Sequence, residues 1–327
     1  MVRVSILIAA RNEEANILAC LEAVAQLDWP ASHLDVWIGN DGSEDRTGER
    51  VAGFISDKPH FHLLHVTGQV GAARGKSNVL AQLAARATGD YLFFTDADVR
   101  VPPAWIKSML AAWKPGVGLV NGVTLVAGEG LAARLQAIEW VYAISLMRRF
   151  AERRIPITAM GNNMMTTREA YLSTGGYERL PFSITEDYQL FRCIRAKGFG
   201  FRQAFNPGVL AFTAPAGSWR QLLQQRKRWM TGAMQLPWYQ KLFVIAEALL
   251  VPAVVALGLY HPLAAGLLFA LRAALIVGEV RGALRRLDQR GRFRDVWPYL
   301  PYHFLVVTAN VLYYLLPVPV VWKGRKY

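Results

Sequence analysis

Short apolar runs alternate with amphipathic helical patterns in the N-terminal part of the chain. Val4–Ala9, Leu34–Ile38 and Tyr91–Thr95 are apolar runs of strand length, and a weaker run lies around His62–Val66. A helical pattern from about Lys76 to Ala87 precedes the Tyr91–Thr95 run, and helical patterns follow the two earliest runs. Because strands that alternate with helices form parallel sheets covered on both faces, we expect an α/β fold with a mostly parallel sheet.

Local signals predict the remaining elements of this part. We expect Asn12 to cap the first helix and Pro102-Pro103 to open a later one. Gly118–Val126 is predicted as one strand. Leu131–Phe150 has the pattern of a helix, which we expect to pack against the sheet, with a position in the membrane interface as the alternative.

The chain becomes almost continuously apolar after Leu236-Pro237. This change predicts a globular α/β domain at 1–236 and a membrane domain at 237–327. Three apolar helices are expected in the second domain, at about 242–260, 263–280 and 299–322. Each comes near the ~20 residues that are needed to cross a bilayer. The first two are expected to form a hairpin across the membrane.

The third apolar segment contains Pro317 and Pro319, which leave open whether it crosses the membrane or turns back. Glu247, Arg272 and Glu279 interrupt the first two segments. Charges inside a bilayer are costly, so Arg272 is expected to pair with one of the two glutamates or to reach the interface.

The chain is basic, with 37 Lys and Arg against 24 Asp and Glu and a net charge of +13. The basic clusters lie beside apolar segments: Arg148–Arg154, Arg220–Arg228, Arg281–Arg294 and Lys323–Lys326. This placement favours an anionic lipid surface over nucleic acid as a partner. Two cysteines give no disulfide framework, which fits a reducing compartment. The apolar run at Met1–Ala9 is too short for a signal peptide. By the positive-inside rule, we expect a multi-pass protein of the plasma (inner) membrane with the 1–236 domain on the cytoplasmic side.

Two carboxylates follow the most apolar strand directly. Asp96 and Asp98 come at the carboxyl edge of the predicted sheet, where open α/β folds bind their ligands. Residues two apart on an extended backbone point to one side, so both are expected to face one ligand. Hard oxygen anions suit Mg²⁺ or Mn²⁺ carrying a phosphorylated substrate, although a solvated turn is the alternative.

Two other loops carry candidate chemistry. Asp41 follows the second strand, where its carboxylate could accept the N3–H of a uracil ring. Lys76 opens a helix after Arg74-Gly75 and suits phosphate or ribose. The alternatives are an ordinary helix cap for Asp41 and a solvated basic turn for Lys76.

Two further segments lie nearer the C-terminus. Thr185 is expected to cap a helix through Ala196, and Asp187 in its first turn could act as a general base, although a dipole partner is the alternative. Arg228 could bind a pyrophosphate and Trp229 could stack on an acceptor, with a plain basic juxtamembrane helix as the alternative.

The ordered set of these residues resembles a known pattern. Asp41, Asp96-Ala-Asp98, Thr185-Glu186-Asp187 and Gln225-Arg-Lys-Arg228-Trp229 resemble the D, DxD, (T/E)D and QxxRW motifs of family-2 glycosyltransferases. The resemblance implies an inverting enzyme of the GT-A fold that uses a nucleotide sugar. It also implies individual roles. Asp41 would hold the nucleotide's uracil base, Asp96 would contact the ribose or the metal shell, and Asp98 would bind the cation. Asp187 would be the catalytic general base, and Arg228 and Trp229 would contact the diphosphate and the acceptor. Lys76, Glu186 and Gln225 are expected among the substrate-binding residues, and Gly161-Asn162-Asn163 falls where the family places a loop near the transferred sugar.

The C-terminal end of the chain narrows the expected acceptor. Val320–Lys326 resembles the ending of members that glycosylate membrane lipids, such as glycolipid, hopanoid and carotenoid glycosyltransferases. We therefore expect transfer from a UDP-sugar to a hydroxyl of a membrane lipid, assisted by Mg²⁺ or Mn²⁺. A processive polysaccharide synthase of the cellulose, chitin or hyaluronan type is one alternative, but those enzymes normally have membrane helices before the catalytic domain, and none is expected here. A non-catalytic, basic membrane-anchored binding protein is the other. Asn40 and Ala10-Arg11 depart from the residues that are frequent at their positions in the family.

Overall fold

The computed structural model describes residues 2–322 and 325–326, and the side chains of all of these except 243–244, 322 and 325–326. Lys323 and Gly324, which belong to the last predicted basic cluster, lie outside the described residues. The chain forms two compact units. The first consists of residues 1–125 and 147–214, and the second of residues 126–146 and 215–327.

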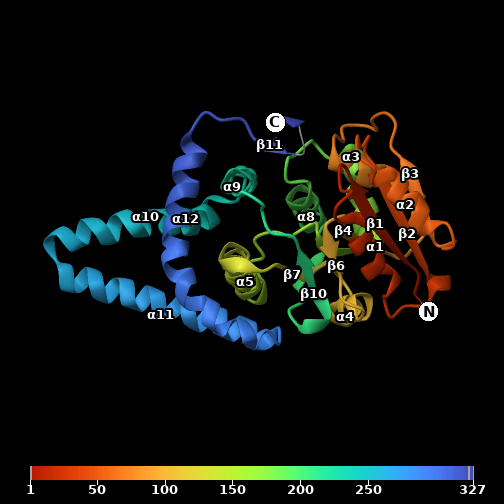
Figure 1. Cartoon of the computed structure of the whole chain (residues 1–327). Helices are drawn as coiled ribbons and strands as arrows, with labels where there is room; N and C mark the ends of the chain where they lie inside the picture. Colours follow the sequence, from red (N-terminus) through yellow and green to blue (C-terminus); the bar gives the residue numbers. More distant parts are fainter. Residues whose placement is uncertain (1, 323–324, 327) are drawn as a thin grey trace. The chain divides into compact units, whose positions relative to one another are not determined.

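A seven-stranded sheet forms the centre of the first unit (Figure 1). Its strands, in spatial order, are β3 (Phe61–His65), β2 (Leu34–Asn40), β1 (Val4–Ala10), β4 (Tyr91–Asp96), β8 (Asn163–Thr167), β6 (Val117–Asn121) and β9 (Gly200–Gln203). The first four are parallel to one another, and β9 is parallel to β6. Only β8 runs antiparallel to its neighbours β4 and β6. The expectation of a mostly parallel sheet is therefore confirmed.

Helices connect these strands. They are α1 (Ile17–Ala25), α2 (Thr47–Ile55), α3 (Lys76–Arg86), α4 (Trp105–Ala112), α6 (Arg168–Ser173), α7 (Gly176–Arg179) and α8 (Glu186–Ala196), with short turns η1 (Ala31–His33) and η2 (Pro207–Val209). Helix α3 buries Val79 and Leu83 against β1 and β2. A side chain at Gly39 would collide with Val79, so this glycine allows α3 to lie close to β2. The close packing places the start of α3 at the carboxyl edge of the sheet.

The cap predicted at Asn12 and the single strand predicted at Gly118–Val126 are both wrong. Asn12 does not cap α1, which begins at Ile17; Asn12 instead has a φ of 52° and accepts a hydrogen bond from the Glu44 N–H. The predicted strand Gly118–Val126 is broken at Gly122 into β6 and β7 (Val123–Val126), which belong to different sheets. Gly122 donates its N–H to the Asn163 carbonyl, and the Asn163 side chain fills the space that a side chain at Gly122 would need.

The break at Gly122 creates a second, smaller sheet. Strand β7 joins it together with β5 (Val99–Arg100) and β10 (Leu210–Thr213), in the order β5-β10-β7. β10 and β5 are antiparallel, with Thr213 opposite Val99. This pairing ties the chain that follows Asp98 to a segment more than a hundred residues later.

Long helices dominate the second unit (Figure 1). These are α9 (Trp219–Ala233), α10 (Trp238–Tyr260), α11 (Pro262–Arg286) and α12 (Val296–Leu315), with the turn η3 (Arg290–Asp295) and the strand pair β11 (Val321–Trp322) and β12 (Arg325–Lys326). Helices α10 and α11 form a hairpin about His261. Both are long and apolar enough to cross a membrane. Length and composition alone are weak evidence of membrane association. The third predicted segment differs from expectation, because α12 ends at Leu315, before Pro317.

Helix α5 (Gly130–Glu152) begins in the second unit, which contains its residues up to Leu146. We expected this helix to pack against the sheet, but side chains of its part in the second unit contact the C-terminal helices. The Tyr142 hydroxyl accepts a hydrogen bond from Arg272 at 2.6 Å, and Ser145 donates to Glu279. Arg272 also contacts both carboxylate oxygens of Glu247, at 2.6 and 2.5 Å. Of the two predicted partners of Arg272, the structure therefore selects Glu247.

Candidate active site

Lys76 joins two of the predicted motifs in the first unit. Its Nζ lies 2.5 Å from Asp96 Oδ1 and 3.0 Å from Glu186 Oε1. Lys76 is the first residue of α3, Asp96 the last of β4 and Glu186 the first of α8, so three elements meet at this point. The Glu186 side chain is 8% exposed, whereas those of Lys76 and Asp96 are 27% and 33% exposed. The cluster is thus enclosed on one side and reachable from solvent on the other.

The charges around Lys76 fix its protonation. Burial by itself would lower the pKa of Lys76, but Asp96, Glu186 and Asp187 outweigh burial and raise that pKa above its usual value. Lys76 therefore carries a full positive charge at any physiological pH. Its ammonium group can donate a hydrogen bond to a phosphate oxygen that enters from the open side, but the surrounding carboxylates leave the cluster net negative, so a divalent cation would be needed to attract a diphosphate.

Asp187 is oriented by backbone donors. Its Oδ2 accepts the Gly161 N–H at 2.8 Å, and its Oδ1 accepts the Tyr188 N–H at 2.8 Å. A Cβ on Gly161 would lie 3.0 Å from the Asp187 Cβ and 3.4 Å from its Oδ2, so glycine permits the approach. The carboxylate is therefore held in one orientation, as a general base must be. The predicted cap of this helix is not formed, because the Thr185 side chain makes no cap hydrogen bond.

The loop that carries Gly161 is itself fixed to the sheets. Asn121 Oδ1 accepts the Met160 N–H at 2.6 Å. The Asn162 carbonyl accepts the Thr95 hydroxyl at 3.1 Å, and its side-chain oxygen accepts the Thr124 hydroxyl at 3.3 Å. Strands β4, β6 and β7 thus position the backbone amide that orients Asp187.

Asp98 lies in a different setting from Asp96. Ala97 and Asp98 form a turn between β4 and β5, so the two carboxylates are not on one extended strand as predicted; that both face one ligand stays a prediction. Asp98 Oδ2 accepts the Thr213 hydroxyl at 3.2 Å. Thr213 was missed by sequence reasoning, since it is more than a hundred residues away and lies in no motif.

The donor set near Asp98 fits one kind of metal site. Among the described residues, no group of three or more His, Cys, Asp or Glu side chains is placed to hold a metal ion. Mg²⁺ is commonly bound by one or two carboxylates while substrate phosphates supply further oxygens. Asp98 and Asp96 therefore fit a cation that is shared with a diphosphate, and do not fit one that the protein holds alone.

Asp41 stands at the same edge of the sheet as Asp96. It follows β2, whose Asn40 pairs with Ala10 of β1, and Ala9 of β1 pairs with Asp96 of β4. With one strand between β2 and β4, the two backbone positions are about 10 Å apart. Such a span suits a ligand that extends from a base to a diphosphate.

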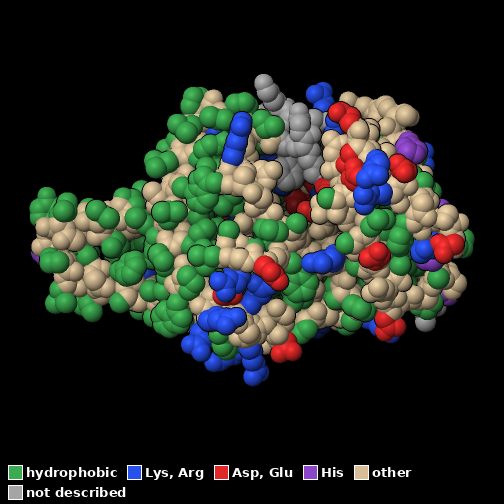
Figure 2. Space-filling model, in the orientation of Figure 1, with side chains coloured by type: hydrophobic (Ala, Val, Ile, Leu, Met, Phe, Trp, Pro, Cys, Tyr) green, Lys and Arg blue, Asp and Glu red, His purple; other side chains and the backbone are tan. Residues whose placement is uncertain are grey.

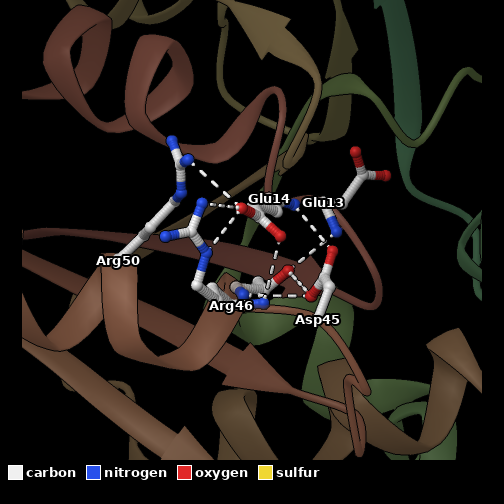
Figure 3. Close-up of polar contacts among 6 residues, drawn as sticks. Glu13, Glu14, Asp45, Arg46 and Arg50 are labelled. Atoms are coloured by element: carbon white, nitrogen blue, oxygen red, sulfur yellow. Dashed lines mark hydrogen bonds and ion pairs between the residues drawn. The ribbon is translucent and has the colours of Figure 1, made fainter.

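The two loops beside Asp41 are fastened together by polar contacts, many of them drawn in Figure 3. Glu14 Oε1 lies 2.7 Å from Arg46 Nη2 and 3.2 Å from Arg50 Nη2, and Asp45 Oδ2 accepts the Glu14 N–H at 3.0 Å. Arg11 Nη1 donates to the Asp41 carbonyl at 2.8 Å. Arg11, at a position where the family often has proline, thereby holds the backbone of Asp41 in place. A cation directly after a buried strand was the signal that could have drawn attention to it.

Gln225, Arg228 and Trp229 lie on α9, in the second unit. Their contribution to the site that contains Asp187 therefore stays a prediction. Within the second unit, two neighbouring residues of α9 are engaged differently. Arg226 donates to both oxygens of Glu139 at 2.8 Å, and Lys227 donates to the Leu316 carbonyl at 2.6 Å.

Comparison with known proteins identifies the chain. The model of glycosyl transferase family 21 matches residues 2–327. The chain belongs to glycosyl transferase family 21. The prediction of a glycosyltransferase is thereby confirmed. The matching model is that of family 21, whereas the motifs resembled those of family 2.

Its relatives include two proteins with informative names. The chain is 29% identical over 240 residues to "Probable glycosyltransferase YdaM" of Bacillus subtilis (strain 168). This match covers 70% of this chain and 55% of that protein. It is 28% identical over 242 residues to the beta-monoglucosyldiacylglycerol synthase of Synechocystis sp., covering 71% of this chain and 48% of that protein. The chain thus spans about half the length of these curated relatives.

A solved structure shows the same fold. The mannosyltransferase PcManGT from Pyrobaculum calidifontis, in complex with GDP-Man and Mn²⁺, superimposes with a TM-score of 0.56 at 21% identity. The match covers 92% of this chain and 87% of that protein. The predicted GT-A fold is therefore confirmed, as an α/β sheet followed by long apolar helices.

Proposed function

We propose that this glycosyltransferase moves a sugar from a nucleotide-sugar donor to a hydroxyl group of a membrane lipid. The observation that carries the proposal is the arrangement around Lys76, where Asp96 and Glu186 meet one ammonium group. The backbone-oriented carboxylate of Asp187 follows Glu186 directly. A site with an oriented carboxylate beside a lysine ammonium group suits displacement of a diphosphate by a hydroxyl, with a divalent cation to balance the remaining carboxylates.

The donor would extend along the carboxyl edge of the sheet. Asp41 is proposed to accept the N3–H of a uracil ring, which makes a UDP-sugar the proposed donor. Asp96 would contact the ribose, and Lys76 would contact the diphosphate. Arg228 of the QxxRW motif is proposed as a second cation for the diphosphate, with Gln225 as a further substrate contact.

The reaction is proposed as one in-line displacement with inversion at the anomeric carbon. Asp187 removes the proton of the acceptor hydroxyl as its oxygen attacks, and contributes about 10²–10⁴ in rate. Lys76 stabilises the negative charge that develops on the departing diphosphate. Mg²⁺ or Mn²⁺, held by Asp98 and the donor's phosphate oxygens, would neutralise part of the same charge. The solved mannosyltransferase with this fold was determined with Mn²⁺, which supports testing that ion first.

The composition of α10 and α11 supports a lipid acceptor. Many of their apolar side chains face outward, including Leu259 at 77% and Leu263 at 78% exposure. Figure 2 shows hydrophobic side chains covering both helices, and Lys and Arg side chains gathered where α11 ends. We propose that the hairpin anchors the protein in the plasma (inner) membrane, with the basic stretch and the catalytic domain on the cytoplasmic side. The names of the synthase relatives favour a diacylglycerol as the acceptor.

Product analysis tests this function. The detergent-purified protein is incubated with labelled sugar nucleotides and a total lipid extract, with and without Mn²⁺. A chloroform-soluble product bearing one sugar is expected, in larger amount with Mn²⁺. Long polysaccharide chains that are not extracted into chloroform would instead support a processive synthase, and the absence of any sugar transfer would contradict both.

A further inference from the structure

The apolar hairpin of the second unit is divided by one charged pair. Arg272 of α11 contacts both carboxylate oxygens of Glu247 on α10, at 2.6 and 2.5 Å. Arg272 follows Pro262 by ten residues and Glu247 precedes Tyr260 by thirteen. At ~1.5 Å per residue, the pair therefore lies about 15–20 Å from the end of the hairpin. We call residues 248–271, which contain no Asp, Glu, Lys or Arg, the tip segment.

The tip segment projects without protein around it. The structure describes all of residues 248–271, and among them only Ala265 is buried. Leu259 and Leu263, on either side of the turn, are 77% and 78% exposed. Burial on α11 resumes at Ile276, just after the charged pair. Figure 1 shows both helices continuing past α12, which crosses them. An apolar projection of this size indicates an apolar partner.

The charged pair is attached to polar helices of the same unit. The Tyr142 hydroxyl of α5 accepts a hydrogen bond from Arg272 at 2.6 Å. One turn earlier on α5, Glu139 accepts two hydrogen bonds of 2.8 Å from Arg226 of α9. Residues 226–228 of α9 are all basic. Because charged side chains are costly in hydrocarbon, α5 and α9 mark a level outside the bilayer core, and Arg272 lies close to that level.

The tip segment is too short to cross a bilayer from this level. The hydrocarbon core is ~30 Å thick, about twice the projection of the tip segment. If the tip reached the far headgroups, Arg272 and its partners on α5 and α9 would lie near the middle of the core. If instead Arg272 and Glu247 lie at the near boundary of the hydrocarbon, the charges stay among the headgroups and the tip ends near the midplane.

Helix α12 has the form of a helix that lies on a membrane surface. Trp297, Leu305 and Leu312 share one side of it and are 62%, 61% and 60% exposed. Another side contacts the polar helices: Tyr302 donates to α5 at 3.2 Å, and Tyr313 accepts a hydrogen bond from α9 at 2.6 Å. Since both contacts hold α12 beside α5 and α9, its exposed apolar side fits the plane of the interface.

The basic residues of the hairpin lie on one side of the charged pair. Lys241 precedes Glu247 on α10, and Arg281 and Arg285 follow Arg272 on α11. The tip segment has none. This distribution complements anionic headgroups at the base of the hairpin and hydrocarbon at its tip.

We propose that the hairpin enters a single leaflet of an anionic membrane and ends near the midplane. Arg272 and Glu247 then lie at the boundary between headgroups and hydrocarbon, and α12 lies along that boundary. The inference rests on the membrane anchoring in the proposed function. It replaces the expected crossing of the bilayer with one-sided insertion, so that the partner of the tip segment is the acyl chains of one leaflet.

The test measures the depth of three positions on one side of α11. Leu263, Leu267 and Leu271 are spaced four residues apart and are 78%, 64% and 59% exposed. Each is changed singly to cysteine in a Cys193→Ser chain, whose remaining Cys20 is fully buried, and is labelled with bimane. The labelled proteins are bound to phosphatidylcholine–phosphatidylglycerol vesicles that hold iodide inside and outside. Lipids with nitroxides near the ester groups or near the chain ends report shallow and deep positions.

Depth should increase from Leu271 to Leu263. The deep nitroxide should quench the Leu263 label at least about twofold more than the shallow one, the Leu271 label should show the reverse order, and iodide should not quench the Leu263 label. Gly53→Cys is the matched control, because a Cβ there meets no atom within 4 Å; iodide should quench its label and lipid nitroxides should not. If Leu263→Cys does not fold, Leu259→Cys on the other side of the turn should give the Leu263 result.

A crossing hairpin gives the opposite order. Greatest depth at Leu271, with iodide quenching of the Leu263 label, would overturn the proposal. A Leu263 label that no lipid nitroxide quenches would also overturn it, since water or protein would then surround the tip. Sugar transfer to dioleoylglycerol in the same vesicles is measured separately. The predicted depth order without a lipid product would support the insertion and contradict the proposed acceptor class.

Discussion

The backbone N–H of Gly161 donates a hydrogen bond to Asp187 Oδ2 at 2.8 Å, across 26 positions of sequence. A loop that three strands position thus orients the carboxylate to which we assign the role of base. This relationship makes the geometry of the reaction depend on a residue that has no side chain.

Gly161→Ala should therefore reduce turnover without reducing donor binding. The new Cβ would stand 3.0 Å from the Asp187 Cβ and must push the carboxylate or the loop aside. A displacement of a catalytic group by less than about 1 Å commonly costs 10- to 100-fold in rate, so we expect kcat to fall by about that factor. Donor affinity, measured by calorimetry with UDP, should stay within about threefold.

Gly53→Ala is the control for this substitution. Gly53 lies in α2, and a Cβ there would meet no atom within 4 Å. Alanine also has the higher helix propensity, so full activity and an unchanged or slightly higher melting temperature are expected. Equal kcat values for Gly161→Ala and the wild type would show that the hydrogen bond does not position the base.

Lys76→Met should weaken both the fold and donor binding. It leaves Asp96 and Glu186 without their shared cation, at a cost of about 1–3 kcal/mol in the free energy of unfolding, since the cluster is only partly exposed. Donor affinity should fall roughly 10-fold or more because the diphosphate loses a charged contact. Lys107→Met is the control: its ion pair with Asp28 is exposed and should be worth under about 1 kcal/mol.

The pH dependence of this effect follows from the pKa shift. The pKa of Lys76 is raised in the folded protein, so its contribution is complete below the usual pKa of lysine and is lost only as pH rises beyond the folded-state value. The difference in unfolding free energy between wild type and Lys76→Met should therefore be constant from about pH 6 to pH 9. A difference that declines within this window, seen by denaturant titration, would contradict the assignment.

Much of this arrangement could be predicted from the sequence, because it depends on local patterns. The apolar run that begins at Tyr91 predicted a strand. Because the carboxyl ends of parallel strands share one edge of a sheet, Asp41 and Asp96 could be expected at that edge. The contacts between distant segments could not be predicted in the same way. The break at Gly122 depends on the Asn163 side chain, and the setting of Asp98 depends on Thr213. Such contacts arise only when the second sheet forms, and no periodicity in the sequence carries them.

Cys20 should resist alkylation while the protein is folded. It is fully buried, and its thiol donates to the Asp96 carbonyl at 3.5 Å. Burial, and then the negative charges of Asp98 and Asp96, raise the pKa of the thiol. At pH 8, iodoacetamide should modify Cys20 only at the rate of global unfolding. Mass spectrometry across a urea series measures this rate, and fast modification in native buffer would show that the strand ends open independently.

Replacing the basic residues after α11 should weaken membrane association. Arg290, Arg292 and Arg294 lie in η3, next to the apolar hairpin. Each charge near an anionic surface contributes about 1 kcal/mol, so changing all three to Gln should reduce binding to phosphatidylglycerol vesicles more than tenfold at low salt. Binding to neutral phosphatidylcholine vesicles should not change. An equal loss on both vesicle types would indicate a general packing defect.

The most direct test of the account is the turnover of Asp187→Asn. Asparagine keeps the shape of the side chain and an oxygen that can accept the Gly161 N–H, but it cannot take up a proton. We predict that kcat for sugar transfer falls by about 10²–10⁴ while the affinity for the nucleotide, measured by calorimetry on the same sample, stays within about threefold. Transfer by Asp187→Asn at the wild-type rate would contradict the account.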